Sequence, residues 1–429
     1  MGNQIEYIET GVNWLSKIPS TWESKRIKML TRVKRGASPR PIDNPIYFDE
    51  EGEFAWVRIA DVTASERYLE NTTQRLSELG SSLSVKRYPD DFFLSIAGTV
   101  GKPIITKIKC CIHDGFVYFP DLKINPEFLY YIFSTGLPYL GLGKMGTQLN
   151  LNTDTVGDIY IPIPEDTEIE KIVNYLDERT AEIDNLIFRK QKLIECLKEE
   201  RLVQIRLLTT KGIEKKQFKN SGIDWIGEIP NEWEAKKLKY VSRKVQTGNT
   251  PPTSKDEYYG DDFDWFTPAD FSDNLLLENS SRKISFLAVQ DEVVRVFPEN
   301  SVLIVGIGAT LGKVGYITSP ASSNQQINAI VFSSIEEAKF YANLFYAFKD
   351  VVLSKSNAST LAILNQAQTK DFIVPVPAEQ ELPLIVSEIE ELNTRIENTI
   401  RKIEQEIELI KEYRTSLINE VVTGKITLN

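Results

Sequence analysis

Residues 11–23 read GVNWLSKIPSTWE and residues 222–234 read GIDWIGEIPNEWE, so the same opening occurs twice in the chain. Two further pairs match at nearly the same distance. They are TVGK at 99–102 with TLGK at 310–313, and DIYIPIP at 158–164 with DFIVPVP at 371–377. The shift between the copies stays between 211 and 213 residues, and chance does not hold a shift constant over separate matches. The chain is therefore a tandem duplication of one unit of about 212 residues.

Each copy begins with a mixed segment rich in glycine, proline, aromatic and β-branched residues. Short apolar runs such as 92–96 and 302–305 predict strands between turns. The repeated Pro-x-Pro exits at 162–164 and 375–377 predict an extended edge, because proline lacks the amide that a sheet ladder needs. Both mixed segments are thus expected to be globular α/β domains.

A long helix is expected after each globular segment. Residues 168–210 and 379–423 contain no glycine, and their only proline, Pro383, lies in a first turn, where a helix tolerates it. Gly212 and Gly424 follow the two segments as C-terminal stop signals. Such a helix would be about 65 Å long, which exceeds the width of a domain of about 160 residues.

Apolar residues on both helical segments fall on one stripe with a seven-residue period. The seam residues are Leu176, Ile183, Ile187, Ile194 and Leu197 in the first helix and Ile389, Ile396, Ile403, Ile410 and Leu417 in the second. Lys190 and Arg414 interrupt the stripe, although a single polar seam residue can also fix the register. We expect the stripes to face each other as an antiparallel coiled coil with pseudo-two-fold symmetry. The alternative is that each helix packs only on its own globular domain.

The predicted fold class is α+β, with two globular mixed α/β domains that are each followed by a long helix. The expected boundaries are 1–164 for the first domain, 165–211 for the first helix, 212–377 for the second domain and 378–429 for the second helix. A chain of 429 residues is long enough to give each domain its own hydrophobic core.

Composition excludes several classes of protein. The three cysteines, Cys110, Cys111 and Cys196, have no Cys-x-x-Cys spacing, so we expect neither a disulfide framework nor a thiolate zinc site. His113 is the only histidine, which excludes His-rich metal motifs. No apolar run approaches about 20 residues, and the N-terminus does not look like a signal peptide. The expected location is the reducing cytoplasm.

The net charge of −11 is unusual for a nucleic-acid-binding protein, but the charge is unevenly distributed. The two helical segments carry 7 of the 11 excess negative charges. Seven basic residues and no acidic one lie from Lys25 to Arg40, and five lie at the equivalent place from Lys236 to Lys244. Each cluster precedes a glycine-containing loop and is suited to binding phosphates, while a solvated surface is the plain alternative.

Some local patterns resemble catalytic or nucleotide-binding motifs without meeting them. The run NPIY at 44–47 departs from the Asn-Pro-Pro-Tyr/Phe motif of adenine-N6 methyltransferases and favours a proline turn. The run GIGATLGK at 306–313 lacks phosphate-loop spacing and favours a tight turn. A loose nuclease-like pattern, PD at 89–90 and DLK at 121–123, has no counterpart in the second copy. His113 is expected to be a hydrogen-bonded loop residue.

Together the repeated Trp-containing opening, the Thr-x-Gly-Lys turn, the Pro-x-Pro exit and the long helix resemble the specificity subunit of a type I restriction–modification system. The resemblance covers the whole chain. It implies that the chain is not catalytic and binds double-stranded DNA, and that each domain is a target-recognition domain for one half of a split, asymmetric site. It also implies two methyltransferase subunits held on the paired helices, restriction/translocase subunits as further partners, and no membrane partner. The chain itself would need no cofactor, since the methyl donor, ATP and magnesium belong to the partners.

Specific base contacts call for Arg, Lys, Asn, Gln, Ser or Thr on loops that reach the major groove. The DNA-binding candidates are Arg35, Arg40, Arg58, Lys102, Lys144 and Gln148 in the first domain, and Arg243, Lys244, Thr250, Lys255, Arg282, Lys313 and Asn357 in the second. Lys102 is expected to contact phosphate rather than a base. The helices would hold the two half-sites of the DNA target at a fixed separation, since half-sites on one face of B-DNA lie about 34–36 Å or a multiple apart.

Two other classes of function stay open on these residues. One is an enzyme in its own right, either a DNA methyltransferase or a nuclease, and turnover by the purified chain with DNA, methyl donor and magnesium would favour it. The other is a coiled-coil scaffold that joins two protein-binding domains. Salt-dependent binding to duplex DNA would count against the scaffold.

Overall fold

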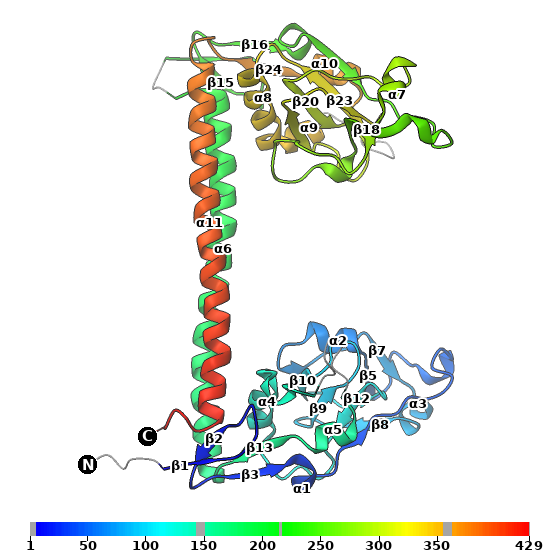
Figure 1. Ribbon diagram of the computed structural model, residues 1–429, viewed down its shortest axis with the longest axis vertical. Coiled ribbons are helices and arrows are strands. Elements are labelled where there is room, and N and C mark those ends of the chain that lie inside the picture. Colours follow the sequence, from blue (N-terminus) through cyan, green and yellow to red (C-terminus); the bar gives the residue numbers. More distant parts are fainter. Residues whose placement is uncertain (1–5, 143–150, 214–216, 355–362, 429) are drawn as a thin grey trace, which may run out of the picture. The chain divides into compact units, whose positions relative to one another are not determined.

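The computed structural model describes residues 6–142, 151–213, 217–354 and 363–428 (Figure 1). The chain forms two compact units. Unit 1 comprises Met1–Lys190 with Gln405–Asn429, and unit 2 comprises Gln191–Glu404. Each unit therefore combines one globular domain with parts of both long helices. No helix in the described part of the chain is both long enough and apolar enough to cross a membrane.

The two long helices are α6, Asp166–Lys211, and α11, Leu382–Val422. The glycine that follows each helix has a left-handed backbone, with φ of +73° at Gly212 and +70° at Gly424. This conformation suits glycine and ends a helix, so the predicted stop signals are confirmed. The second helix begins four residues after the expected segment boundary at 378.

In unit 1 the beginning of α6 lies beside the end of α11, and the two run in opposite directions (Figure 1). Asp184 accepts two hydrogen bonds from the guanidinium of Arg414, at 2.9 and 3.1 Å. One turn and a half further along α6, Lys190 donates to Glu406 at 2.6 Å. The two residues that interrupt the apolar stripe therefore form ion pairs between the helices.

In unit 2 the end of α6 packs beside the beginning of α11. Ile205 of α6 shares a hydrophobic core with Ile385, Ile389 and Ile396 of α11. All ten predicted seam residues of the two helices are buried or half-buried. The alternative in which each helix packs only on its own domain is therefore wrong. The pseudo-two-fold relation between the copies stays a prediction.

The globular domain of unit 1 contains two mixed sheets. The first has the order β4-β12-β9-β10-β6 and the second the order β7-β5-β11-β8. Their strands are β4 Lys34–Arg35, β5 Phe54–Val57, β6 Tyr68–Leu69, β7 Gln74–Leu76, β8 Val85–Arg87, β9 Phe92–Ser95, β10 Pro103–Thr106, β11 Cys110–Ile112 and β12 Phe116–Tyr118. The helices are α1 Ile27–Leu30, α2 Ile59–Ala64, α3 Glu78–Ser82, α4 Pro126–Ser134 and α5 Thr153–Gly157, with 3-10 turns η1 Pro45–Tyr47 and η2 Leu137–Tyr139.

The globular domain of unit 2 repeats this plan with fewer strands. Its sheets have the orders β17-β23-β20-β21 and β19-β18-β22. The strands are β17 Lys244–Thr247, β18 Tyr259–Phe266, β19 Lys283–Ile284, β20 Ser301–Val305, β21 Val314–Ile317, β22 Ser322–Ser323 and β23 Ile327–Val331. The helices are α7 Phe286–Gln290, α8 Ile335–Ala347, α9 Lys349–Ser354 and α10 Gln366–Asp371, with 3-10 turns η3 Leu238–Tyr240, η4 Asp256–Tyr258 and η5 Pro268–Asp270.

Two short two-stranded pairings complete the plan in similar form in each unit. The Pro-x-Pro exits form β13 Tyr160–Ile163 and β24 Ile373–Val376, each paired with one strand only, β3 Glu23–Arg26 and β16 Glu234–Lys237. The predicted extended edges are therefore confirmed. The repeated openings form the hairpins β1 Tyr7–Glu9 with β2 Lys17–Pro19, and β14 Phe218–Asn220 with β15 Glu228–Pro230. The larger helix of each domain covers its first sheet, with α4 against β10 and α8 against β20 and β21 (Figure 1).

Candidate nucleic-acid interface

The repeated tryptophan joins each globular domain to the long helices. Trp22 donates its indole N–H to Glu168 at 2.8 Å, and Trp233 donates to Glu381 at the same distance. Both glutamates lie at or just before the start of the following long helix. Both tryptophans are almost fully buried. Since an indole has one donor, this bond leaves none for a base or phosphate, so Trp22 and Trp233 attach the globular domains to the helices and are not donors to DNA.

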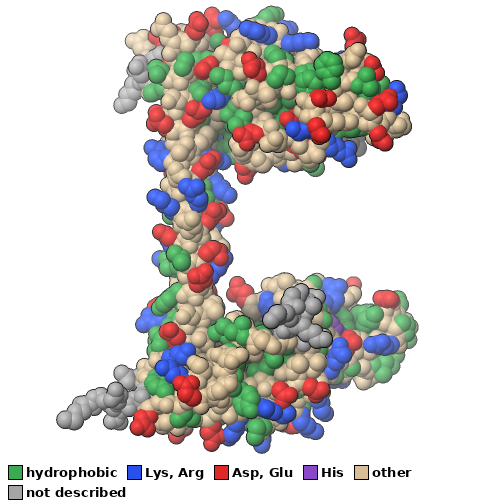
Figure 2. Space-filling model, viewed as in Figure 1, with side chains coloured by type: hydrophobic (Ala, Val, Ile, Leu, Met, Phe, Trp, Pro, Cys, Tyr) green, Lys and Arg blue, Asp and Glu red, His purple; other side chains and the backbone are tan. Residues whose placement is uncertain are grey.

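The two basic clusters are largely neutralised by neighbouring acids. Lys28 lies 2.6 Å from Asp158, and the equivalent Asp371 lies 3.2 Å from Lys237 and 3.0 Å from Lys239. Hydrogen bonds from these lysines lower the pKa of both aspartates below the usual range. Figure 2 likewise shows blue and red side chains interspersed over both globular domains. The clusters support local structure at the domain edges, and phosphate binding by them stays a prediction.

The lysine of each Thr-x-Gly-Lys turn donates to backbone carbonyls of its own domain. Lys102 donates to the carbonyls of Thr63, at 3.1 Å, and of Ser65, and Lys313 donates to that of Phe271 at 2.8 Å. Burial lowers the pKa of the half-buried Lys102. Both ammonium groups thus bind carbonyls at the end of the short helix that follows β5 or β18, namely α2 in unit 1 and η5 in unit 2. DNA contacts by either lysine stay predictions.

The segment just before these carbonyls carries a further repeat, which is not among the motifs above. The pattern Trp-x-x-x-Ala-Asp begins at Trp56 and again at Trp265, with a shift of 209 residues. Asp61 accepts a hydrogen bond from the backbone amide of Arg58 at 2.8 Å, and Asp270 accepts the equivalent bond at 2.7 Å. The shift differs from 211 by only two residues, so a search that tolerated short deletions would have found it.

Three of the candidate arginines of the first domain contact neighbouring loops. Arg35 donates to the carbonyl of Asp114, and the guanidinium of Arg40 lies 3.6 Å from the carboxylate of the same residue. Arg58 donates to the hydroxyl of Thr73. Arg35 and Arg40 therefore come together at one loop, while Arg58 lies at a capped helix start.

The candidates of the second domain are more dispersed. Arg243 donates to Ser333 at 3.0 Å, Lys255 donates to the Tyr258 hydroxyl at 3.2 Å, and Thr250 donates to Gln325. Lys244 and Arg282 are exposed at the start of β17 and just before β19. Lys144, Gln148 and Asn357 lie outside the described residues. The structure assigns none of these side chains to DNA, so all remain candidates.

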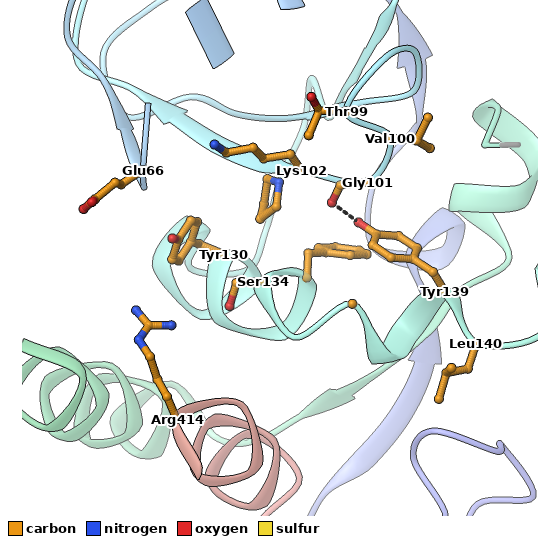
Figure 3. A pocket seen from close by; sticks show the side chains of 13 residues that line it. Glu66, Thr99, Val100, Gly101, Lys102, Tyr130, Ser134, Tyr139, Leu140 and Arg414 are labelled. Carbon is orange, nitrogen blue, oxygen red and sulfur yellow. Dashed lines mark hydrogen bonds between the residues drawn. The ribbon is translucent and has the colours of Figure 1, made fainter. Parts of the chain in front are cut away.

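A cavity of about 640 Å³ lies in unit 1 between the Thr99–Pro103 turn, α4 and α11 (Figure 3). Lys102 and Arg414 contribute its basic groups and Glu66 an acidic one. The Tyr139 hydroxyl donates to the carbonyl of Gly101 at 2.8 Å and so ties the turn to the segment after α4. Lys102 donates hydrogen bonds to backbone carbonyls and Arg414 donates to Asp184, so both basic groups of this cavity already have partners within the protein.

The run at 44–47 and His113, which were weighed above for catalytic roles, have structural roles. The run at 44–47 is a 3-10 turn, in which the side chain of Asn44 accepts the amide of Ile46 at 3.2 Å. His113 accepts the amide of Gly115 at 2.8 Å through Nδ1, which confirms it as a hydrogen-bonded loop residue. Burial raises the pKa of Cys110 to about 12, so its thiol is a poor nucleophile at neutral pH. Among the described residues, no group of three or more His, Cys, Asp or Glu side chains is placed to hold a metal ion.

Comparison with known proteins gives one family. A family model described as the type I restriction modification DNA specificity domain matches residues 19–195 and again residues 230–409. The chain is 24% identical to the type I restriction enzyme MjaIX specificity subunit of Methanocaldococcus jannaschii, over 99% of this chain and 97% of the relative. It is 23% identical to the MjaVIII specificity subunit of the same organism, over 96% and 94% of the two chains.

A solved structure has the same fold. It comes from a study of complex assembly and conformational transition of the type I restriction–modification system, and it superposes with a TM-score of 0.70 at 16% identity. The superposition covers 95% of this chain and 99% of the other. The shared fold extends over both copies of the repeat.

Proposed function

Because the chain belongs to the family of type I restriction–modification DNA specificity domains, we propose that it reads a split, asymmetric target in duplex DNA, one half with each globular domain. The chain carries two such domains and is a non-catalytic subunit, since catalysis in these systems lies in other subunits. The observation that carries the proposal is the duplication itself. The two domains share one fold but have separate hydrophobic cores and different surface residues, as recognition of two different half-sites requires.

We further propose that the helices set the gap between the two halves of the target. An α-helix is stiff and rises about 1.5 Å per residue, so the 46 residues of α6 extend about 69 Å. A rod of this length spans more than one helical turn of B-DNA, which is about 34–36 Å. A constant rod would give a constant number of unread base pairs.

Two methyltransferase subunits and restriction/translocase subunits are the proposed protein partners. Large apolar side chains that are exposed on the helical part of unit 1 support this, because apolar and aromatic side chains are commonly buried in protein interfaces. They are Leu186, Phe188, Leu409 and Tyr413, whose exposed fractions range from 44% to 63%. The methyl donor, ATP and magnesium would be bound by the partners, and the complex would act in the cytoplasm.

Mapping of methylated bases tests the proposal directly. A host that carries this gene beside its partner methyltransferase gene should methylate a split, asymmetric motif, and deletion of this gene alone should abolish that methylation. Persistence of the motif after the deletion would contradict the proposal. Turnover by the purified chain with DNA, methyl donor and magnesium would instead favour a stand-alone enzyme. Binding to duplex DNA that does not weaken with salt would favour the scaffold.

A further inference from the structure

Two loops meet at the same place in both units. Loop A comprises residues 36–40 in unit 1 and 248–252 in unit 2. Loop B comprises residues 112–115 in unit 1 and 323–326 in unit 2. Loop A follows β4 or β17, and loop B connects β11 to β12 or β22 to β23.

Equivalent backbone hydrogen bonds hold the two loops together. In unit 1 the amide of Gly36 donates to Phe116 at 2.9 Å and that of Ala37 to Ile112 at 3.1 Å. In unit 2 the corresponding amides, of Gly248 and Asn249, donate to Ile327 at 3.1 Å and to Ser323 at 2.9 Å. The acceptors of the two units differ by 211 residues and the donors by 212, so the same backbone hydrogen bonds join loops A and B in both units. We call this set of hydrogen bonds the frame.

Close packing makes the first residue of loop A a glycine in both units. A Cβ at Gly36 would lie 2.2 Å from the carbonyl oxygen of His113, and one at Gly248 would lie 2.3 Å from that of Ser323. Both distances are far below van der Waals contact, so a side chain here would separate the loops. Pro39 and its counterpart Pro251 are both buried and fix the course of loop A beyond the glycine.

Side chains repeat the same contacts with different chemical groups. The turn of loop B is closed in unit 1 by the bond from Gly115 to His113, at 2.8 Å. In unit 2 the amide of Gln326 makes the equivalent bond to the side chain of Asn324 at 3.0 Å. Burial lowers the pKa of His113 and so favours the neutral ring. Since Nδ1 accepts the amide of Gly115, the proton of the neutral ring lies on Nε2.

The second side-chain contact joins loop A to the tip of loop B. Ser38 donates to the carboxylate of Asp114 at 3.4 Å, and its counterpart Thr250 donates to the amide oxygen of Gln325. In both units the bond ties the acceptor side chain of loop B to loop A. Beyond it, the carboxylate of Asp114 can only accept hydrogen bonds, whereas the NH₂ of Gln325 donates and its oxygen retains a lone pair.

Loops A and B of unit 1 also border a hollow of about 760 Å³. Its wall includes Ser38, Arg40, Trp56, His113 and Asp114, so polar groups of both loops open into one concavity beside an aromatic ring. Arg40 is largely exposed, with 80% of its side chain accessible, and proline replaces it in unit 2 as Pro252. A common frame thus presents different donors and acceptors in the two units.

We propose that loops A and B of each unit form the base-reading surface, with Asp114 and Gln325 as equivalent specificity-determining residues for different bases. The proposal rests on the proposed function and adds the residues that carry it. Asp114 would select a base whose major-groove edge offers an amine, as cytosine and adenine do. Gln325 would select adenine, to which an amide side chain can both donate and accept.

Isosteric substitutions separate the chemistry from the frame. Asp114→Asn and Gln325→Glu each keep an oxygen that accepts the bond from loop A but change the outward donors and acceptors. Asp154→Asn and Gln290→Glu make the same exchanges at exposed residues outside the two loops and serve as matched controls. Each full-length variant is expressed with the partner methyltransferase, and the methylated motif is mapped by sequencing.

We expect Asp114→Asn to change the base preference at one position in one half of the motif, on the order of ten-fold, and Gln325→Glu to do so in the other half. Both controls should keep the wild-type motif. A split motif that is unchanged in both loop variants would overturn the assignment of the loops. A wild-type chain that directs no split motif would overturn the proposed function itself. If Asp114→Asn fails to accumulate, Arg40→Gln repeats the test on loop A, with the same expected and contradicting results.

Discussion

The two units fasten their globular domains to the helices in one way that is shared and one that differs. The shared fastener is the bond from Trp22 to Glu168 in unit 1 and from Trp233 to Glu381 in unit 2. The attachment that differs is an ion pair made by an acidic residue of the long helix, α6 in unit 1 and α11 in unit 2. In unit 1 Asp177 of α6 forms an ion pair with Arg67, which lies just before β6.

In unit 2 the acid at the equivalent position, Glu390, lies 2.5 Å from Lys339 of α8. The two acids differ by a shift of 213 residues, which is the shift of the helices, whereas their basic partners come from unrelated elements. The helices therefore present the same charge to both domains, and each domain meets it with its own residue. Because only the acidic residue of the helix is shared, domains with different basic residues can attach to the same pair of helices.

The largest effect should come from breaking the shared fastener. Trp233→Ala removes a fully buried ring and leaves Glu381 without its indole donor, and should lower the free energy of unfolding by about 3–5 kcal/mol. Trp233→Phe keeps most of the ring and should cost about 1–2 kcal/mol. Denaturant unfolding of the full chain measures both. A loss below about 1 kcal/mol for Trp233→Ala would show that the tryptophan does not fasten the domain.

Breaking the fastener that is specific to unit 1 should have a smaller effect. Arg67 also donates to Glu127 at 2.6 Å, so Arg67→Met leaves two carboxylates without their base. These groups are partly open to solvent, with exposed fractions of 16% to 44%, so we expect a loss of about 2 kcal/mol rather than the 3–5 kcal/mol of a fully buried pair. Arg179→Met breaks the exposed pair with Glu182 and should leave the free energy of unfolding nearly unchanged. Equal losses in the two variants would contradict the fastening role of Arg67.

The ion pairs between the helices should contribute less again. A double-mutant cycle with Arg414→Met and Asp184→Asn should give a coupling energy of about 0.5–1 kcal/mol, because the pair is bidentate but half-exposed. The coupling should fall as salt is added. A coupling of zero at low salt would mean that the pair does not stabilise the helix pairing.

The smallest effect concerns the different residues that close loop B. Burial lowers the pKa of His113 in the folded chain, so the unfolded chain binds a proton more readily. The stability that the neutral ring provides is complete above the unfolded pKa of about 6.5 and is lost as the pH falls below it. His113→Asn, which copies Asn324, should remove this loss and leave stability at pH 8 nearly unchanged. Unfolding curves of both proteins at pH 8 and pH 5.5 give the comparison, and an equal decline in the variant would contradict it.

Features with a period or a repeat could be predicted from the sequence. The duplication, the two helices, their glycine ends and the paired stripes all follow from spacing, which survives changes in individual residues. Strands such as 92–96 and 302–305 were also predictable, because apolar runs between turns have few other solutions. Even Lys190, an interruption in sequence, was explicable once its partner Glu406 was known.

Contacts between residues far apart in the chain could not be predicted in this way. Nothing in the sequence near Lys102 indicates that its ammonium group reaches the carbonyls at the end of α2, because that contact depends on the order of strands in the sheet. The same holds for Asp114 and Ser38, which lie 76 residues apart and meet only when β4 pairs with β12. A basic residue in the sequence therefore did not identify a DNA contact. The hydrogen bonds that repeat between loops A and B instead support our proposal that these loops form the base-reading surface.

Exchange of one globular domain tests the central claim, that each domain reads its own word and the helices keep the words apart. Residues 212–377 are replaced by the equivalent segment of a relative, and the methylated motif is mapped in a host that carries the partner methyltransferase. We predict that one half of the motif changes while the other half and the gap between them stay as they were. A change in both halves, or in the gap, would contradict the claim.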